Sequence, residues 1–237
     1  MAEFWNQVQE NFVFLLCCAG IIAGLAVVSH IAERFLPATR QTTKAKRISV
    51  IAVCSAIAAV LHILDFPLLF LAPEFYKLDF SELPVMLCGF YLGPSAAVAC
   101  EAVKILLKLL LKGTSTAFVG DFANFAVGCS LVLPAVIVYH TKKTRASALW
   151  GLLTGTVVLT VFGSAFNAIY LLPKFSQLFG LPLDTIIGMG SKINGSITSL
   201  QTFVLLAVAP LNLIKGVAIS VLTLLLYKKV ARPLFGK

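Results

Sequence analysis

Long apolar runs recur along this 237-residue chain, and short segments that carry most of the charge separate them. A helix needs roughly 20 apolar residues to cross the hydrocarbon core of a bilayer. Most of the runs approach or exceed this length. They cover residues 12–31, 48–64, 83–100, 122–141, 146–173 and 200–227. The pattern predicts an all-α fold, a polytopic transmembrane helical bundle.

Two prolines subdivide this pattern. Gly93-Pro94 interrupts the third run, and proline is favoured at the first positions of a helix. We therefore expect a short helix over residues 83–92 and a second helix over 95–111. Pro210 lies inside the last run and predicts a kink there. These divisions give seven membrane segments, one of them short.

Basic residues gather in three regions at the ends of the runs, over residues 34–47, 142–145 and 228–237. An excess of lysine and arginine marks cytoplasmic loops. Seven segments place all three regions on one side of the membrane. The sequence thus predicts a multi-pass cell-membrane protein with its N-terminus outside and its C-terminus in the cytoplasm.

Composition supports the membrane assignment, because 59% of the residues are hydrophobic and only 12% are charged. Soluble domains carry about a quarter charged residues. The net charge of +9 is explained by membrane orientation, and no basic face with interleaved aromatics indicates nucleic-acid binding. The three histidines lie near predicted helix ends, where we expect membrane-interface positions.

Sequence signatures of catalysis and metal binding are missing. The chain has no Gly-x-x-x-x-Gly-Lys-Ser/Thr loop, no His-Glu-x-x-His motif and no Gly-x-Ser-x-Gly elbow. Its six cysteines lie in apolar runs without a Cys-x-x-Cys pair, as is typical of buried core thiols. We therefore expect no enzyme activity, no metal and no cofactor.

Polar side chains inside the apolar runs require an explanation, since inserting an ionisable group at membrane depth costs roughly 2.5–3.5 kcal/mol. Asn212 and Lys215 stand three residues apart and hence share a helix face, as do Asn167 and Tyr170. Such pairs bind a polar ligand or tie helices together. For Lys215, a tie would require a carboxylate such as Asp79 or Asp121.

Residues 77–84 form a second polar group. Asp79 and Glu82 lie at a predicted helix start, where carboxylates face the positive end of the helix dipole and Ser81 can act as a cap. A loop that closes over a ligand is the alternative. On the next helix, Glu101 and Lys104 are expected to pair with each other or with Asp121.

Several stretches resemble one family of membrane proteins. KLDFSELPVMLCGFYLGP, VKILLKLLLKGTSTAFVGDFANFAVG, NAIYLLP and PLNLIKG are similar to segments of the riboflavin-specific S components of energy-coupling factor (ECF) vitamin transporters. The resemblance implies a six-helix substrate-binding domain over residues 46–237. Residues 1–45 would then add an extra N-terminal transmembrane helix and a basic loop.

The resemblance also implies roles for particular residues. Asn212 and Lys215 would contact the flavin, joined by Asn167. Ala52 and Ala56, small residues one helical turn apart, would contact a membrane coupling protein, the T component. Two ABC ATPases would supply the energy for uptake of riboflavin, or of FMN.

A flavin combines a flat apolar ring with a hydrogen-bonding edge, so its pocket should be largely apolar with a few placed polar groups. Asn124 and Asp79 are further polar candidates, and Phe80, Phe122 and Tyr170 are candidates to sandwich the ring. Three alternatives remain open: an S component for another vitamin, a membrane enzyme acting on a lipid, and a self-sufficient secondary transporter.

Overall fold

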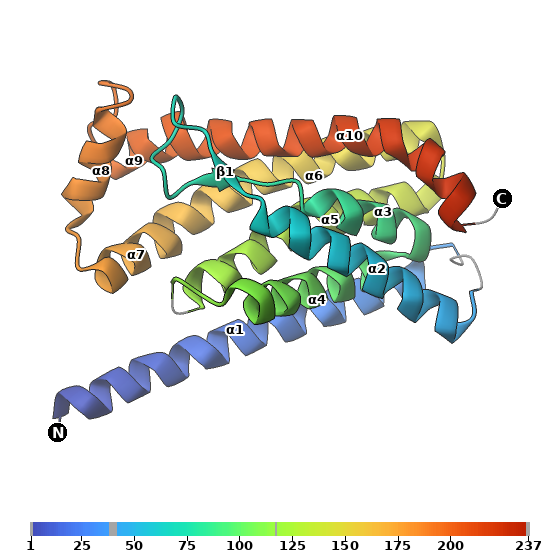
Figure 1. The fold of residues 1–237 in the computed structure, drawn as a ribbon, viewed down its shortest axis with the longest axis horizontal. Helices are drawn as coiled ribbons and strands as arrows, with labels where there is room; N and C mark the ends of the chain where they lie inside the picture. Colours follow the sequence, from blue (N-terminus) through green and yellow to red (C-terminus); the bar gives the residue numbers. More distant parts are fainter. Residues whose placement is uncertain (1, 38–41, 117, 236–237) are drawn as a thin grey trace.

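The chain forms an elongated bundle in which most of the long helices run roughly along the long axis of the molecule (Figure 1). The computed structural model describes residues 2–37, 42–116 and 118–235. The helices are α1 (Ala2–Phe35), α2 (Lys44–Ile63), α3 (Glu82–Leu92), α4 (Pro94–Lys112), α5 (Val119–Lys142), α6 (Arg145–Phe166), α7 (Leu172–Phe179), α8 (Leu183–Ser191), α9 (Leu200–Phe203) and α10 (Ala209–Phe235). Two π-helical turns, η1 (Asn167–Leu171) and η2 (Val204–Val208), join α6 to α7 and α9 to α10.

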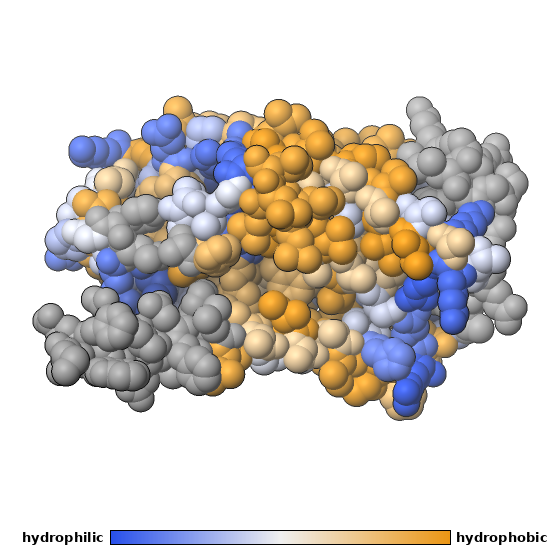
Figure 2. Space-filling model, turned by 60° about the horizontal axis from the view of Figure 1, so that its bottom comes forward, coloured by the Kyte–Doolittle hydropathy of each residue, from blue (hydrophilic) through white to orange (hydrophobic). Residues whose placement is uncertain are grey.

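Within the described residues, five stretches are long and apolar enough to cross a membrane: Cys18–Phe35, Lys44–Ile63, Val119–Lys142, Arg145–Gln177 and Leu200–Tyr227. The shorter α3 is also apolar. On the face shown in Figure 2, apolar side chains form a band across the middle of the molecule, and polar ones lie toward both ends. This surface is that of a membrane protein, and the all-α transmembrane bundle predicted from hydropathy is confirmed.

The two ends of the bundle carry different connections. The α1–α2 and α5–α6 connections and the C-terminal end of α10 lie at one end (Figure 1, right). The segment between α2 and α3, the α4–α5 connection and α7 to α9 lie at the other. The three basic regions therefore share one end, as seven segments require. Residues 38–41 and 236–237 of these regions lie outside the described part of the chain.

The break between α3 and α4 falls where the sequence predicted it. Gly93 has φ 106°, a conformation that residues with a Cβ rarely adopt, and Pro94 opens α4. The chain turns back between α3 and α4 beside the α1–α2 connection, where Ser95 bonds to Glu33 and Arg47. This brings α3 into the centre of the bundle, against α2, α4, α5 and α10.

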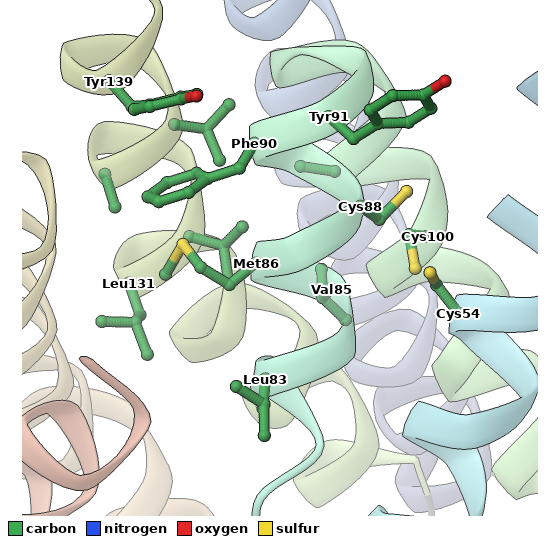
Figure 3. Packing of buried hydrophobic residues seen from close by; sticks show 14 of the residues in the cluster. Cys54, Leu83, Val85, Met86, Cys88, Phe90, Tyr91, Cys100, Leu131 and Tyr139 are labelled. Atoms are coloured by element: carbon green, nitrogen blue, oxygen red, sulfur yellow. The ribbon is translucent and has the colours of Figure 1, made fainter. Parts of the chain in front are cut away.

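Every residue of α3 is buried, and its side chains form the centre of the main core (Figure 3). Phe90 stacks on Tyr139 of α5 with ring centroids 4.2 Å apart. The sulfur atoms of Cys54, Cys88 and Cys100 come together from α2, α3 and α4 (Figure 3). These three cysteines are buried core residues, as their apolar surroundings in the sequence predicted.

Both π-turns precede a proline by two residues. The Leu172 N–H bonds to the Asn167 carbonyl before Pro173, and the Ala209 N–H bonds to the Val204 carbonyl before Pro210. Proline cannot donate a backbone hydrogen bond, and a wider turn accommodates that loss without ending the helix. The disturbance predicted at Pro210 thus takes the form of a π-turn.

Helix α1 packs along α4 and α5. Its Leu25 joins a small core cluster with Val98, Ile105, Phe125, Cys129 and Leu133. Toward its C-terminal end, Glu33 accepts a hydrogen bond from Ser95 and lies 3.6 Å from Arg47. The helix is therefore attached to the bundle by both apolar and polar contacts.

Candidate functional site

A cavity of about 470 Å³ lies at the end of the bundle opposite the basic regions. Its wall combines α4, α5, η1 and α10 with the segment between α2 and α3. In that segment, β1 (Phe66–Pro67) pairs antiparallel with β2 (Lys77–Leu78). The volume falls in the range of pockets that enclose drug-sized ligands, about 300–1,000 Å³.

Five of the side chains predicted to bind substrate line this cavity: Asn124, Asn167, Asn212, Lys215 and Asp79. They come from four different elements, so only the tertiary fold assembles them. Asn212 and Lys215 share a face of α10, as their spacing predicted. Whether they bind a ligand stays a prediction at this point.

The amide of Asn212 lies against α6 at a glycine. A Cβ atom at Gly163 would lie 2.7 Å from Asn212 Nδ2, so the absence of a side chain there makes room for the amide. Asn212 is only 8% exposed, yet Nδ2 has no hydrogen-bond acceptor within the described residues. A buried amide without a partner costs about 1–3 kcal/mol, which a ligand carbonyl in the cavity would recover.

The amide of Asn167 has a fixed orientation. Its Nδ2 donates to the Gly163 carbonyl at 2.7 Å, and its Oδ1 accepts from the Tyr76 hydroxyl at 2.7 Å. Each atom keeps one further hydrogen-bonding capacity, so a ligand would contact Asn167 through the second N–H of Nδ2 or the second lone pair of Oδ1. Asn124 is held in a similar way, since its Nδ2 donates to the Gly120 carbonyl at 3.0 Å.

Lys215 sits between two carboxylates at the inner wall of the cavity. Its Nζ lies 3.2 Å from Asp79 Oδ2 and 2.9 Å from Glu82 Oε2. The pairing with Asp79 is one of the two ties considered from the sequence, while Asp121 pairs with Lys108 at 2.5 Å. Lys215 therefore both ties α10 to α3 and presents a cation to the cavity.

The surroundings of Asp79 keep it ionised. Burial raises the pKa of Asp79, but the Lys215 ammonium and the His62 side chain outweigh burial, so this pKa lies well below its usual range. Asp79 Oδ1 also accepts the Ser81 N–H at 2.8 Å. The Asp79 side chain thus fixes the backbone conformation just before α3 by a hydrogen bond.

The proposed cap by Ser81 is wrong. Ser81 is the N-cap residue of α3, but its side chain makes no capping hydrogen bond. Its Oγ instead accepts from Lys104 Nζ at 3.1 Å. Lys104 also pairs with Glu101, which was one of the two alternatives predicted from the sequence, because the two side chains are three residues apart on α4.

Tyr170 and Phe80 are not part of the cavity wall. A π-turn has more residues per turn than an α-helix, so the fourth residue after Asn167, and not the third, returns to its face. Leu171 therefore joins Asn167 in the wall, and Tyr170 packs against Phe166, with ring centroids 5.0 Å apart. Phe80 packs against the main core.

The aromatic side chains that line the cavity are Phe75, Tyr76 and Phe175, in place of the predicted Phe80, Phe122 and Tyr170. Phe75 and Tyr76 belong to the segment between β1 and β2, where the sequence has no helical or strand periodicity. The only available signal was the concentration of aromatic residues next to the Lys-Leu-Asp-Phe stretch.

Two histidines lie inside the protein and not at the membrane–water interface that the sequence predicted for them. His62 and His140 are 6% and 2% exposed, so neither is an interface residue. His62 follows Cys54 and Ala58 at intervals of four along the buried face of α2, and this spacing could have revealed its position. His62 lines the cavity, whereas the Nε2 atom of His140 hydrogen-bonds to the Gly89 carbonyl at 3.0 Å.

Ala52 and Ala56 lie on the exposed face of α2. The neighbouring exposed side chains are also apolar: Val53, Ile57 and Val60. Small residues on such a face permit close approach of another helix in the membrane.

The family described as "ECF transporter, substrate-specific component" matches residues 46–227. The chain belongs to this family. As an S component it is a subunit of a transporter and not an enzyme, and its family works with a membrane-embedded energy-coupling module. Helix α1 lies before the matched region.

Two curated relatives are similar to this S component. Riboflavin transporter RibU of Staphylococcus aureus (strain TCH60) is 36% identical over 186 residues, which cover 78% of this chain and 90% of RibU. Riboflavin transporter FmnP of Bacillus subtilis (strain 168) is 31% identical, over 78% of this chain and 92% of FmnP. A solved structure, described as "Structure and mechanism of the S component of a bacterial ECF transporter", superposes with a TM-score of 0.64 at 35% identity, over 80% of this chain and 98% of that one.

Proposed function

We propose that this S component captures riboflavin in the 470 Å³ cavity, for ATP-driven uptake by partner subunits. One observation carries the proposal: the amide of Asn212, the amide of Asn167 and the ammonium of Lys215 converge on one cavity in a chain that is similar to riboflavin transporters. Polar groups beside aromatic and aliphatic side chains in one wall suit a flat heterocycle with a polar edge and a polyol tail.

The polar groups match the hydrogen-bonding edge of a flavin. Asn212 Nδ2 is a buried donor without an acceptor in the described chain, and a ring carbonyl would supply one. Lys215 would donate to a second carbonyl or ring nitrogen, and Phe75 and Tyr76 offer aromatic surface to the ring. A ligand without matching acceptors would leave these donors unpaired and would bind more weakly.

Another part of the cavity wall suits the polyol tail. Thr114, Ser115 and Thr116 line it with hydroxyl groups, beside the ammonium of Lys112. A ribityl chain has hydroxyls that pair with such groups. FMN would place its phosphate near the same cation, so FMN is the second ligand to test.

The partner subunits are a T component and two ABC ATPases. The exposed face of α2 at Ala52 and Ala56 would contact the T component. The positive-inside rule puts the three basic regions in the cytoplasm, and the cavity then opens outward, with the N-terminus outside. Residues 46–237 form the substrate-binding domain, and residues 1–45 add a helix to it.

Titration of purified protein with riboflavin tests the proposal. We expect flavin fluorescence to be quenched at or below about micromolar concentrations. Asn212→Ala should weaken binding by about tenfold or more, because it removes the donor for a ring carbonyl. Ile214→Ala, which changes a lipid-exposed side chain on the same helical turn, is the matched control.

Two outcomes would contradict the proposal. Absence of quenching at about micromolar riboflavin, with tighter binding of pyridoxine or a thiamine precursor, would indicate an S component for a different vitamin. Riboflavin uptake by liposomes that contain only this chain would indicate a self-sufficient transporter.

A further inference from the structure

Beneath the cavity lies a cluster of six buried ionisable side chains, which we call the charge cluster. Each is at most 9% exposed. They come from α2, the segment after it, α3, α4 and α10, and they are His62, Asp79, Glu82, Glu101, Lys104 and Lys215.

Ion pairs connect the members of the charge cluster. Lys215 bridges Asp79 and Glu82, at 3.2 and 2.9 Å. Lys104 lies 3.5 Å from Glu82 and pairs with Glu101. Glu82 is thus shared by the two lysines, and the charges form one continuous network from the cavity wall to the interior of α4.

The charges of this network do not balance without a proton. Three carboxylates and two ammonium groups leave one excess negative charge when His62 is neutral. The N-terminus of α3, worth roughly half a positive charge, offsets only part of it. An uncompensated charge in a buried network is strongly destabilising, so the cluster favours binding one more proton.

His62 is placed to hold that proton. Its Nδ1 lies 3.3 Å from Asp79 Oδ2, the same oxygen atom that Lys215 approaches. Apart from this contact with Asp79, Nδ1 has no hydrogen-bond partner within the described part of the chain. A proton on Nδ1 of an imidazolium would bring the charge sum to zero and would give Asp79 a second cation.

The other charged groups near His62 are not included in the charge sum of the cluster. Lys112 donates to the Ile63 carbonyl at 3.4 Å, and it lies 3.6 Å from Asp65. Asp65 also pairs with Lys77 at 3.3 Å. These three side chains lie on the outer part of the cavity wall and are more exposed than the charge cluster, so water screens them.

We propose that His62 is a positioning residue that couples flavin capture to one bound proton. Its imidazolium shares Asp79 with Lys215. The Lys215 ammonium is then available to the ligand. Loss of the proton leaves excess negative charge, which holds the Lys215 ammonium more strongly on Asp79 and Glu82 and away from the ligand. Riboflavin affinity therefore falls as the pH rises. The inference rests on the proposed function, because it assigns Lys215 to the flavin.

Riboflavin dissociation constants measured between about pH 5.5 and about pH 8.5 test this inference. For the unchanged chain we expect a Kd at least about fivefold higher at the upper pH, the lower end of typical coupling between linked sites. His62→Gln should bind weakly and independently of pH. His140→Gln, which changes a buried histidine outside the cavity, should keep the full pH dependence.

A charge-restoring double variant separates this role from simple packing. His62→Gln with Glu101→Gln removes the excess negative charge, because two carboxylates then face two ammonium groups. We expect it to recover riboflavin affinity relative to His62→Gln alone, which a purely structural role of His62 would not predict.

The inference is overturned by either of two results: pH dependence that persists in His62→Gln, or a double variant that binds no better than His62→Gln. Tight riboflavin binding that is independent of pH in the unchanged chain would also reject it while leaving the proposed function intact. Absence of riboflavin binding at any pH would instead reject the proposed function.

Discussion

The hydroxyl of Tyr76 donates a 2.7 Å hydrogen bond to Oδ1 of Asn167, across 91 positions of sequence. Both residues are buried, and both line the cavity. This bond attaches the segment between α2 and α3 to the π-turn η1. It therefore determines both where that segment lies over the cavity and how the Asn167 amide is oriented.

Tyr76→Phe removes this bond while keeping the aromatic ring. We expect riboflavin affinity to fall by about tenfold, because a buried Asn167 Oδ1 loses a donor, at a cost of about 1–3 kcal/mol. Fluorescence titration would measure the change. Tyr227→Phe, which removes a hydroxyl from the Tyr139–Tyr227 pair outside the cavity wall, is the control. Equal affinities of Tyr76→Phe and the unchanged chain would show that the bond does not matter for binding.

Gly163→Ala should impair ligand binding without any change to a polar side chain. The added Cβ would lie 2.7 Å from Asn212 Nδ2, so the amide must move from its place in the cavity wall. We expect riboflavin affinity to fall by at least about tenfold, since a displaced donor loses its hydrogen bond to the ligand. Gly188→Ala adds a methyl group where no atom lies within 4 Å and should leave the affinity unchanged. A Gly163→Ala variant with normal affinity would contradict this placement of Asn212.

Gly151→Leu should destabilise the bundle. Gly151 on α6 packs directly against the backbone of α5, and a Cβ there would collide with the Ala135 carbonyl oxygen. Close helix contact of this kind depends on small residues, and overpacking costs typically about 1–3 kcal/mol. Thermal unfolding in detergent should show a lower midpoint. Gly24→Ala on α1, where no atom lies within 4 Å, should leave the midpoint unchanged or raise it.

Ala56→Trp should separate capture from transport. Ala56 is exposed on α2 and lies outside the cavity wall, so the purified variant should bind riboflavin as the unchanged chain does. A bulky side chain at this position should prevent close approach of a partner helix and abolish uptake in cells that contain the partner subunits. Val161→Trp, on the exposed face of α6, controls for bulk at the lipid surface. Normal uptake by Ala56→Trp would place the partner contact elsewhere.

Much of the site was predictable where its residues lie on one regular helix. Asn212 and Lys215 are three residues apart, so their common face follows from helical periodicity alone. Glu101 and Lys104 pair for the same reason. Tyr170 lies outside the cavity wall, because the π-turn at η1 changes the number of residues per turn and rotates the following side chains away from the α-helical position.

The segment between α2 and α3 was the least predictable part of the site. It contributes Phe75, Tyr76 and Asp79 to the cavity wall, yet its only regular structure is a pair of two-residue strands. Its position depends on bonds to distant elements, such as those from Tyr76 to Asn167 and from Lys215 to Asp79. No local pattern encodes such contacts.

The sequence by itself determined the membrane class, the break at Gly93-Pro94 and the grouping of basic regions at one end, because each depends on hydropathy, charge or backbone restriction read within one segment. Only the tertiary structure decided which polar groups meet. The charge cluster joins residues from five elements, and His62 acquires its carboxylate neighbour only when α2 packs beside the start of α3. Buried ions and amides are stable only with partners, and those partners are far away in the sequence.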